Sequence, residues 1–429
     1  MINNSRDGNR IIPYKMLLEA LRSTRELADR ILPDHILQSL KIGTAKIEEV
    51  ITSYIDKANR GYPIVGYHFS LPSEFLNCFD IVPVCIEGTS YFLSTLLLHG
   101  VEKYYDLMAN WGHPFHTCTS QKGSMGMTLD DLFKFDAIIA PTSPCDCTVA
   151  SYPFFRESKG FPLVLVDMPF LHEEKSYNYY ANQLRTSLEK LGTIIGQKPD
   201  YDKLIKSIKI ENEVNRVKLE LFELLKSKPC PIDNMFNAVS AGTSIFISGT
   251  SENLAFYKEM YKIAKNRYKK SLYYGKTEKI RSIWPYMITF FSVDLLEWLN
   301  MNLGLSVLFD IFNYNFSDPI NTKSDLETLF YGMARKSFNF PMVKQSTQFY
   351  EPFIENCVQF ARDFNANCFI YTQSIACKQF GSLPTILREV LKEEVDIPTL
   401  IIEFDAGDER MTSIKTFKQK IEMFTSTLL

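Results

Sequence analysis

The sequence has little that would mark a nucleic-acid-binding, secreted or membrane protein. Lys and Arg number 47 against 50 Asp and Glu, so there is no basic excess to attract nucleic acid. The first eight residues are mostly polar, so we expect no signal peptide, and no apolar run is long enough to cross a bilayer. We therefore expect a cytoplasmic globular protein. The chain of 429 residues is longer than a domain with a single hydrophobic core usually is. This length predicts two domains, with a helical addition.

Two short motifs are also missing. The stretch 242–249 begins and ends with glycine, but it lacks the following Gly-Lys-Ser/Thr of a phosphate-binding loop. We therefore expect no ATP site, and any nucleotide has to be handled by another protein. The chain also lacks a compact Cys-x-x-Cys pair, which argues mildly against a structural zinc site.

Cysteine, by contrast, is present nine times. In a reducing compartment an odd number of thiols indicates core residues, nucleophiles or metal ligands rather than disulfides. A single free Cys most often packs as a small hydrophobe. Apolar or helical neighbours predict that role for five of the nine: Cys78, Cys85, Cys230, Cys357 and Cys368. The Cys-x-Cys pair of Cys145 and Cys147 is less easily explained in this way.

Short apolar runs alternate with helical stretches along most of the chain. Such runs, separated by helices, are typical of parallel strands that are covered on both faces. The fold class that we predict is α/β, with two doubly wound parallel-sheet lobes, an N-terminal helical segment and a helical connection. The expected strands lie at residues 62–68, 81–86, 136–140, 162–169, 280–288, 306–310, 368–371 and 399–405.

The same pattern divides the chain into four parts. Helical spacing predicts an N-terminal helical segment over residues 1–60, and a charged helical pattern predicts a connection over residues 191–275. Between them, residues 61–190 form the first expected α/β lobe. Residues 276–429 form the second.

Three cysteines occupy equivalent places in these lobes. Cys118, Cys145 and Cys377 each lie where a buried strand is expected to open into a loop. In open parallel sheets, ligands bind at the carboxyl ends of the strands. The three thiols therefore point to a metal site in the cleft between the lobes, with ligands from both halves of the chain.

Several segments resemble the 2-hydroxyacyl-CoA dehydratase family, which includes the cluster-binding subunits of ATP-dependent benzoyl-CoA reductase. The resemblance runs from about residue 50 to the C-terminus. Three features depart from the family pattern, and one of them is the expected strand 284–291, which lacks the glycine usually placed there. Gln121-Lys122 stands where an arginine is often found, and Cys147 adds a thiol. The segments that carry the resemblance are residues 66–76, 81–84, 116–126, 140–146, 162–169, 374–378 and 397–410.

The resemblance implies that Cys118, Cys145 and Cys377 hold a 4Fe-4S cluster, which leaves one iron without a protein thiolate. Thiolates suit iron and sulfur, and an open iron position could accept a substrate oxygen. A double-cubane iron–sulfur cluster stays open as an alternative. Such a cluster would need about six thiolates, so Cys147 and further cysteines would have to bind it together with Cys118, Cys145 and Cys377. A zinc site completed by Cys147 or a histidine, in a non-catalytic scaffold subunit, is the other alternative.

The resemblance also implies an activity and partners. Members of the family pair with a homologous subunit, as a heterodimer or homodimer, and receive low-potential electrons from an ATP-hydrolysing iron–sulfur activator protein. The expected reaction is the radical dehydration of a 2-hydroxyacyl-CoA. A benzoyl-CoA reductase-type subunit, which reduces an aromatic acyl-CoA, or a double-cubane-cluster reductase of small molecules is the alternative.

A few other polar residues are candidates for the same site. Glu74 follows Pro72 near the expected cleft, so we predict a catalytic or ligand-binding role, although a carboxylate in the first turn of a helix is often only structural. His116, with His113, could supply protons or hydrogen bonds beside Cys118. The turn 405–410 is expected to be a solvated, mutually paired group of charges.

Overall fold

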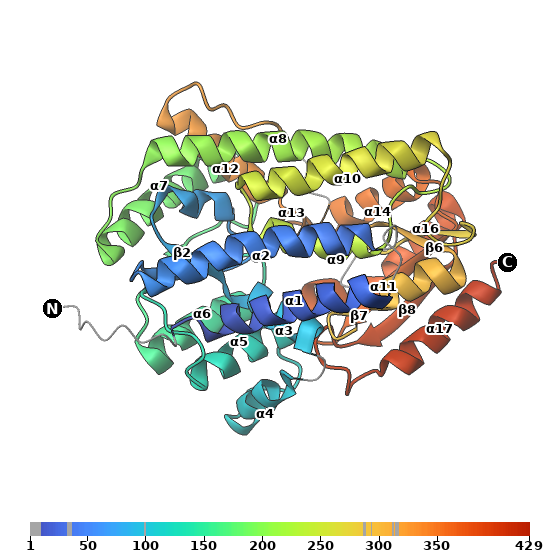
Figure 1. The fold of residues 1–429 in the computed structure, drawn as a ribbon, viewed down its shortest axis with the longest axis horizontal. Helices are drawn as coiled ribbons and strands as arrows, with labels where there is room; N and C mark the ends of the chain where they lie inside the picture. The colour runs from blue at the N-terminus through green and yellow to red at the C-terminus, as the bar shows by residue number, and fades with distance from the viewer. Residues whose placement is uncertain are drawn as a thin grey trace.

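The computed structural model describes residues 10–31, 37–97, 100–285, 289–292, 294–310, 313 and 317–429. This part of the chain contains two four-stranded parallel sheets and many helices, so the predicted fold class is confirmed. Figure 1 shows the first sheet and its helices toward one end of the molecule and the second sheet toward the other. Parts of two expected elements, residues 1–9 and 32–36 of the helical segment and 286–288 of one strand, lie outside the described residues.

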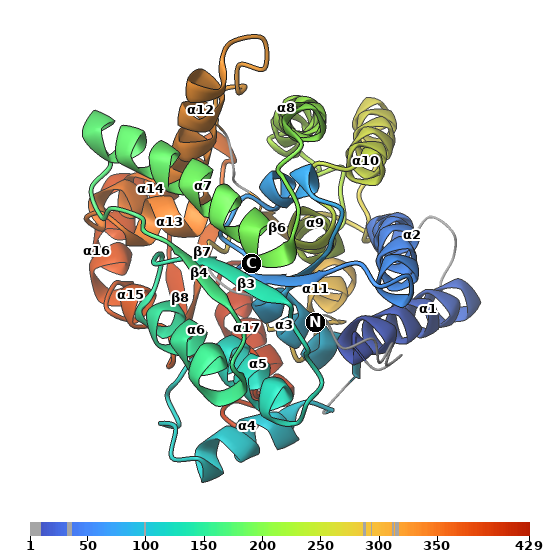
Figure 2. The ribbon, with the colours of Figure 1, turned by 90° about the vertical axis from the view of Figure 1, so that its left-hand side faces the viewer.

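The first sheet has the order β2-β1-β3-β4, and all of its pairs are parallel. Every residue of β1, β2 and β3 is buried, as their continuous apolar sequences require. Helix α7 (Glu174–Ile195) lies on one side of this sheet and α6 (Asp146–Lys159) on the other (Figure 2). The strands are β1 (Ile64–Tyr67), β2 (Val82–Cys85), β3 (Ala137–Pro141) and β4 (Leu163–Val166).

The second sheet repeats this arrangement with the order β6-β5-β7-β8, again parallel throughout. Its strands are β5 (Ile280–Ile283), β6 (Leu305–Phe309), β7 (Cys368–Ser374) and β8 (Thr399–Phe404). In each sheet the direction of winding reverses between the two central strands. Ligand sites of open α/β sheets lie at the carboxyl ends of the strands at such a switch point.

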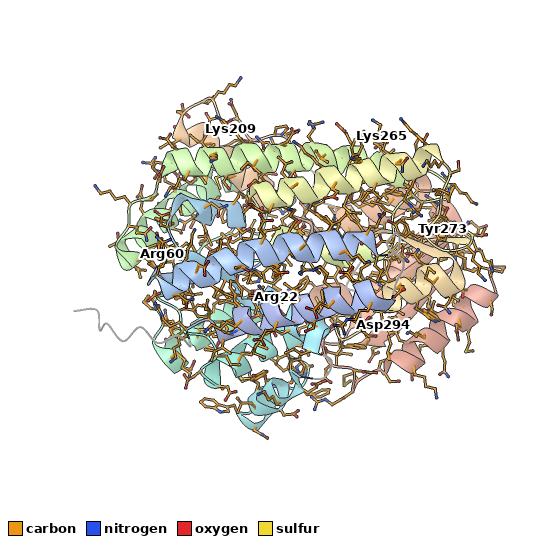
Figure 3. The ribbon with its side chains drawn as sticks, in the orientation of Figure 1. Arg22, Arg60, Lys209, Lys265, Tyr273 and Asp294 are labelled. Carbon is orange, nitrogen blue, oxygen red and sulfur yellow. The ribbon has the colours of Figure 1, made fainter. Side chains whose placement is uncertain are left out.

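A layer of long helices runs across both sheets. Helices α8 and α10 lie side by side, and α2 packs on α9, α10 and α1 (Figure 1). Exposed charged side chains such as Arg22, Lys209 and Lys265 stand on the outer side of this layer (Figure 3). The helices are α1 (Ile12–Ile31), α2 (Gln38–Asn59), α8 (Tyr201–Leu225), α9 (Met235–Phe246) and α10 (Ser251–Lys269).

Local capping explains where two of these helices begin. The side chain of Asp200 accepts hydrogen bonds from the backbone N–H groups of Asp202 and Lys203 at the start of α8. Thr250 caps α10 in the same way, by accepting from Asn253. Such caps satisfy N–H groups that have no partner inside the helix.

Helix α12 (Leu326–Asn339) follows β6 in the chain but packs against α7 of the first lobe. Its buried residues Met333 and Phe338 belong to the hydrophobic core of that lobe. The second half of the chain therefore contributes to both cores.

The remaining helices connect the strands or cover the sheets. In the first half of the chain they are η1, a 3-10 helix (Ser73–Cys78), α3 (Ile86–Leu97), α4 (Glu102–Asn110) and α5 (Thr119–Leu129). In the second half they are α11 (Asp294–Trp298), the π-helix η2 (Leu299–Leu303), α13 (Pro341–Ser346), α14 (Glu351–Asp363), α15 (Lys378–Gly381), α16 (Pro384–Val395) and α17 (Ile414–Ser426). Among the described helices, none combines the length and the apolar character that a membrane-spanning helix needs.

Candidate functional site

Four cysteines line one cavity of about 70 Å³, called the cysteine cavity below. Cys118, Cys145 and Cys147 reach it from the first lobe, and Cys377 reaches it from the second. The structure thus brings together all four thiols that the sequence pointed to. Whether they bind a metal stays a prediction.

Three of these cysteines directly precede helices. Cys118 is the N-cap of α5, Cys145 of α6 and Cys377 of the short helix α15. Cys147 lies in the first turn of α6. The free N–H groups and the dipole at the start of a full-length helix favour negative charge, so α5 and α6 favour thiolates at Cys118 and Cys145.

Burial acts in the opposite direction on the free thiols. It raises the pKa of Cys118 well above its ordinary value, and the neighbouring Cys147 and Cys145 raise this pKa further. Burial also raises the pKa of Cys145 to about 12, although a hydrogen bond with Thr148 lowers it. Both thiols are therefore protonated at neutral pH, and only a strong positive centre would convert them to thiolates.

The walls of the cavity are largely apolar and aromatic. Tyr91 and Phe290 stack with 4.4 Å between ring centroids, and Phe92, Ile245 and Met342 complete this wall. The Tyr91 hydroxyl also lies 3.6 Å from Cys118 Sγ. Such a lining excludes bulk water and strengthens electrostatic interactions inside.

A hydrogen-bonded chain leads from Cys145 to the end of β1. Cys145 Sγ lies 3.1 Å from Thr148 Oγ1, which lies 3.0 Å from His68 Nε2. The backbone N–H of Ser70 donates to His68 Nδ1, so the ring proton belongs on Nε2. His68 then donates to Thr148, which leaves the Thr148 hydroxyl free to donate to the sulfur. Burial lowers the pKa of His68 to about 3, so this ring is neutral.

Glu87 is the buried carboxyl group of the cysteine cavity. Its Oε1 accepts hydrogen bonds from the Tyr152 hydroxyl (2.6 Å) and from Gln121 Nε2 (3.1 Å). Its Oε2 has no hydrogen-bond partner within the described part of the chain. Burial raises the pKa of Glu87 to about 7, against the lowering effect of these hydrogen bonds. Glu87 can therefore hold or release a proton near neutral pH.

The two lobes are joined beside Cys118. Asp405, at the end of β8, accepts a hydrogen bond of 2.7 Å from the hydroxyl of Thr119, the residue after Cys118. Asp408 pairs with Arg410 as expected, but the expectation that this turn is solvated is wrong for Asp405 and Asp408, which are each 2% exposed. Asp405 is buried because it binds backbone N–H groups of its own turn and a residue of the other lobe.

The two predicted catalytic residues lie elsewhere. Glu74 is buried, but it lines a second, polar cavity of about 50 Å³ and forms an ion pair with Lys336. His116 is exposed and does not line the cysteine cavity. His113 is half-buried against the ring of Phe154. The structure therefore brings neither Glu74 nor His116 to the cysteines.

The thiols of the cysteine cavity are of the ligand type that an iron–sulfur cluster takes. As they are placed, the described residues contain no group of three or more His, Cys, Asp or Glu side chains that could hold a metal ion. Four thiols nevertheless surround one cavity. Ligands of a multinuclear cluster bind different metal atoms and stand farther apart than those of a tetrahedral zinc site.

Sequence reasoning missed Glu87, His68 and Thr148. One signal was available for two of them, because His68 directly follows β1 and Glu87 comes two residues after β2. Polar residues at the carboxyl ends of parallel strands are site candidates in any open sheet. Nothing local distinguishes Thr148 from other residues at the start of a helix.

Comparison with known proteins identifies the family of the chain. Residues 69–428 match the family model of 2-hydroxyglutaryl-CoA dehydratase, D-component. A search of curated proteins finds no match to the chain. The family match covers both sheets except the first strand, and all four cysteines of the cavity. The chain therefore belongs to the 2-hydroxyglutaryl-CoA dehydratase D-component family.

Proposed function

We propose that this chain is the cluster-binding subunit of a cytoplasmic enzyme that dehydrates a 2-hydroxyacyl-CoA with low-potential electrons. The observation that supports this most directly is the cysteine cavity, in which thiols from both lobes meet inside an apolar wall. Family membership supports a dehydratase-type subunit. The acyl-CoA substrate class and the electron supply are parts of the proposal.

In this proposal Cys118, Cys145 and Cys377 hold a 4Fe-4S cluster, and Cys147 stands beside them. When bound, the cluster supplies single electrons and an iron position that a substrate oxygen can reach. The protein residues have separate tasks. Thr148 and Tyr91 place hydroxyl groups near two of the sulfurs, and such hydrogen bonds tune the potential of a cluster. Glu87 holds a proton at the cavity wall.

The partners follow from the family and from the sequence. We propose that the subunit pairs with a homologous subunit and is reduced by an ATP-hydrolysing iron–sulfur activator protein. The chain itself lacks a phosphate-binding loop in the stretch 242–249, so the ATP-dependent step belongs to that activator. Four cysteines line the cavity, which favours one cubane over a double-cubane cluster with its need for about six thiolates.

Metal analysis of the anaerobically purified protein tests the proposal. We expect about four iron and four sulfide per chain, little zinc, and brown colour. Cys118→Ser, Cys145→Ser and Cys377→Ser should each lower the iron content, because each removes one of three thiolate ligands.

The matched control is Cys230→Ser, because Cys230 is buried in the hydrophobic core around the second sheet and does not line the cavity. It should keep its iron. Full iron occupancy in one of the three other variants would remove that cysteine from the ligand set. Stoichiometric zinc without iron in the wild type would contradict the proposed chemistry.

A further inference from the structure

A second cavity lies beside the first and has a different character. It has a volume of about 50 Å³ and is lined by four charged residues: Glu74, Glu211, Lys218 and Lys336. We call it the charged cavity. Five serines also line it: Ser70, Ser73, Ser244, Ser248 and Ser337. Phe69 lines both cavities, so the two are neighbours.

Three of the four charged residues, Lys336, Glu74 and Glu211, form ion pairs with one another. Lys336 Nζ lies 2.7 Å from Glu74 Oε1 and 3.2 Å from Glu211 Oε1. The Ser248 hydroxyl lies 3.2 Å from Glu74 Oε2 and 3.1 Å from Glu211 Oε2. The backbone N–H of Gly249 also donates to Glu211 Oε2, at 3.2 Å. All four carboxylate oxygens therefore have partners, and Lys336 is paired twice.

A close approach of the backbone makes this pairing possible. Gly249 has a φ of 71°, and a Cβ atom at this position would lie 2.1 Å from Ser207 Oγ and 2.6 Å from Glu74 Cβ. Only glycine fits here without displacing these groups. Glycine at position 249 therefore allows its backbone N–H group to lie within hydrogen-bonding distance of the Glu211 carboxylate.

The fourth charge, Lys218, has no such partner. The residue is only 3% exposed, and its ammonium group lies 5.1 Å from the centroid of the Tyr257 ring. Within the described residues it has no hydrogen-bond acceptor and no carboxylate at ion-pair distance. One aromatic face cannot satisfy three N–H donors, so the ammonium group keeps hydrogen-bonding capacity toward the cavity that Lys218 lines.

We propose that the charged cavity binds the carboxylate group of a small ligand, with Lys218 as the anchor and the serine hydroxyls as further donors. The carboxylates of Glu74 and Glu211 select for this class, because they would repel a dianionic phosphate more strongly than a monoanion. This site is separate from the proposed cluster and does not depend on it. The carboxylate can belong to a free acid or to the acyl group of a thioester that extends past Phe69.

Binding to the metal-free, full-length protein tests the proposal. Calorimetric titration of the wild type with acetate and with glutarate should show one saturable site per chain, and inorganic phosphate should bind more weakly. Lys218→Met removes the charge but keeps a long unbranched side chain. It should weaken binding by about tenfold or more, the usual effect of losing a hydrogen bond to a charged group. Lys218→Arg should restore part of it.

The matched control is Lys209→Met, which removes an exposed lysine from the same helix, α8 (Figure 3). It should bind acetate as the wild type does. A comparison of glutaryl-CoA with butyryl-CoA separates the two sources. If the protein binds glutaryl-CoA more tightly than butyryl-CoA, and Lys218→Met abolishes this difference, the bound carboxylate belongs to the acyl group of a thioester. If the protein binds acetate but does not distinguish the two thioesters, the bound carboxylate belongs to a free acid.

The wild-type titration keeps the proposal falsifiable even if Lys218→Met fails to fold. Absence of saturable acetate binding to the wild type would overturn it, as would tighter binding of phosphate than of acetate. Equal losses in Lys218→Met and Lys209→Met would overturn the role of Lys218. Because no metal is needed, failure here is distinguishable from failure to find iron in the cysteine cavity.

Discussion

The carboxyl group of Glu87 is buried beside the cysteine cavity in surroundings that favour its protonated form. Its two hydrogen-bond donors, Tyr152 and Gln121, do not balance the loss of water. A carboxyl group with a raised pKa stabilises the fold fully below its unfolded pKa, near 4.5, and loses that contribution as the pH rises to the folded pKa, about 7.

We therefore expect Glu87→Gln to change the pH dependence of stability. The neutral amide avoids the burial of a charge, so the variant should gain stability relative to the wild type between about pH 4.5 and 7, by about 3 kcal/mol in total. Urea unfolding of the metal-free protein at pH 5 and pH 8 measures this difference. The exposed Glu389→Gln serves as the control, and a Glu87→Gln effect independent of pH would contradict the assignment.

A single side chain joins the second sheet to two of the helices around it. Arg281, on β5, is 2% exposed and forms an ion pair of 2.9 Å with Glu278. Its guanidinium group also donates to the carbonyl oxygens of Leu225 and Ser227, at and just after the end of α8, and to that of Phe364 after α14. These last carbonyls of α8 have no partner inside the helix, so Arg281 satisfies them.

Arg281→Met should therefore lower the free energy of unfolding by about 3 to 5 kcal/mol, because it leaves Glu278 as a buried charge without its partner. The measurement is the shift of the urea midpoint followed by circular dichroism. Arg216→Met is the matched control on the surface of α8, where Arg216 pairs with Glu213 and Glu220. It should cost no more than about 1 kcal/mol. Similar losses in the two variants would show that the burial of Arg281 does not matter.

At the scale of the whole molecule, the cysteine cavity depends on the contact between the lobes. Cys377 is the cysteine that the second lobe contributes, and Asp405 binds Thr119 next to Cys118 across the same contact. A ligand that binds only the folded arrangement stabilises it by mass action. A cluster held from both lobes would therefore resist their separation.

Anaerobic reconstitution with iron and sulfide should accordingly raise the Tm of the wild type by several degrees. Cys377→Ser should lose most of this increase, whereas Cys230→Ser should keep it even if its own starting Tm is lower. Thermal unfolding before and after reconstitution gives the comparison. An equal increase in Cys377→Ser would mean that metal binding does not link the lobes.

The strands and the candidate thiols can be predicted from local sequence alone. Each of the eight strands has a local signal in the sequence, because a buried parallel strand needs a short continuous apolar run. Strands β1, β3 and β7, for example, lie within or close to the predicted ranges. The positions of Cys145 and Cys377 after such runs were also readable, since the carboxyl ends of parallel strands share one edge of a sheet. These features depend on neighbours in the chain.

Which polar groups come into contact depends on how distant segments of the chain pack together. Thr119 and Asp405 are 286 residues apart, and Glu74 meets Lys336 across 262 residues. No local pattern specifies such pairs, because they arise when α12 packs into the first core and when β8 ends beside α5. For the same reason the sequence placed Glu74 and His116 with the cysteines, whereas packing put Glu74 in the charged cavity and left His116 at the surface.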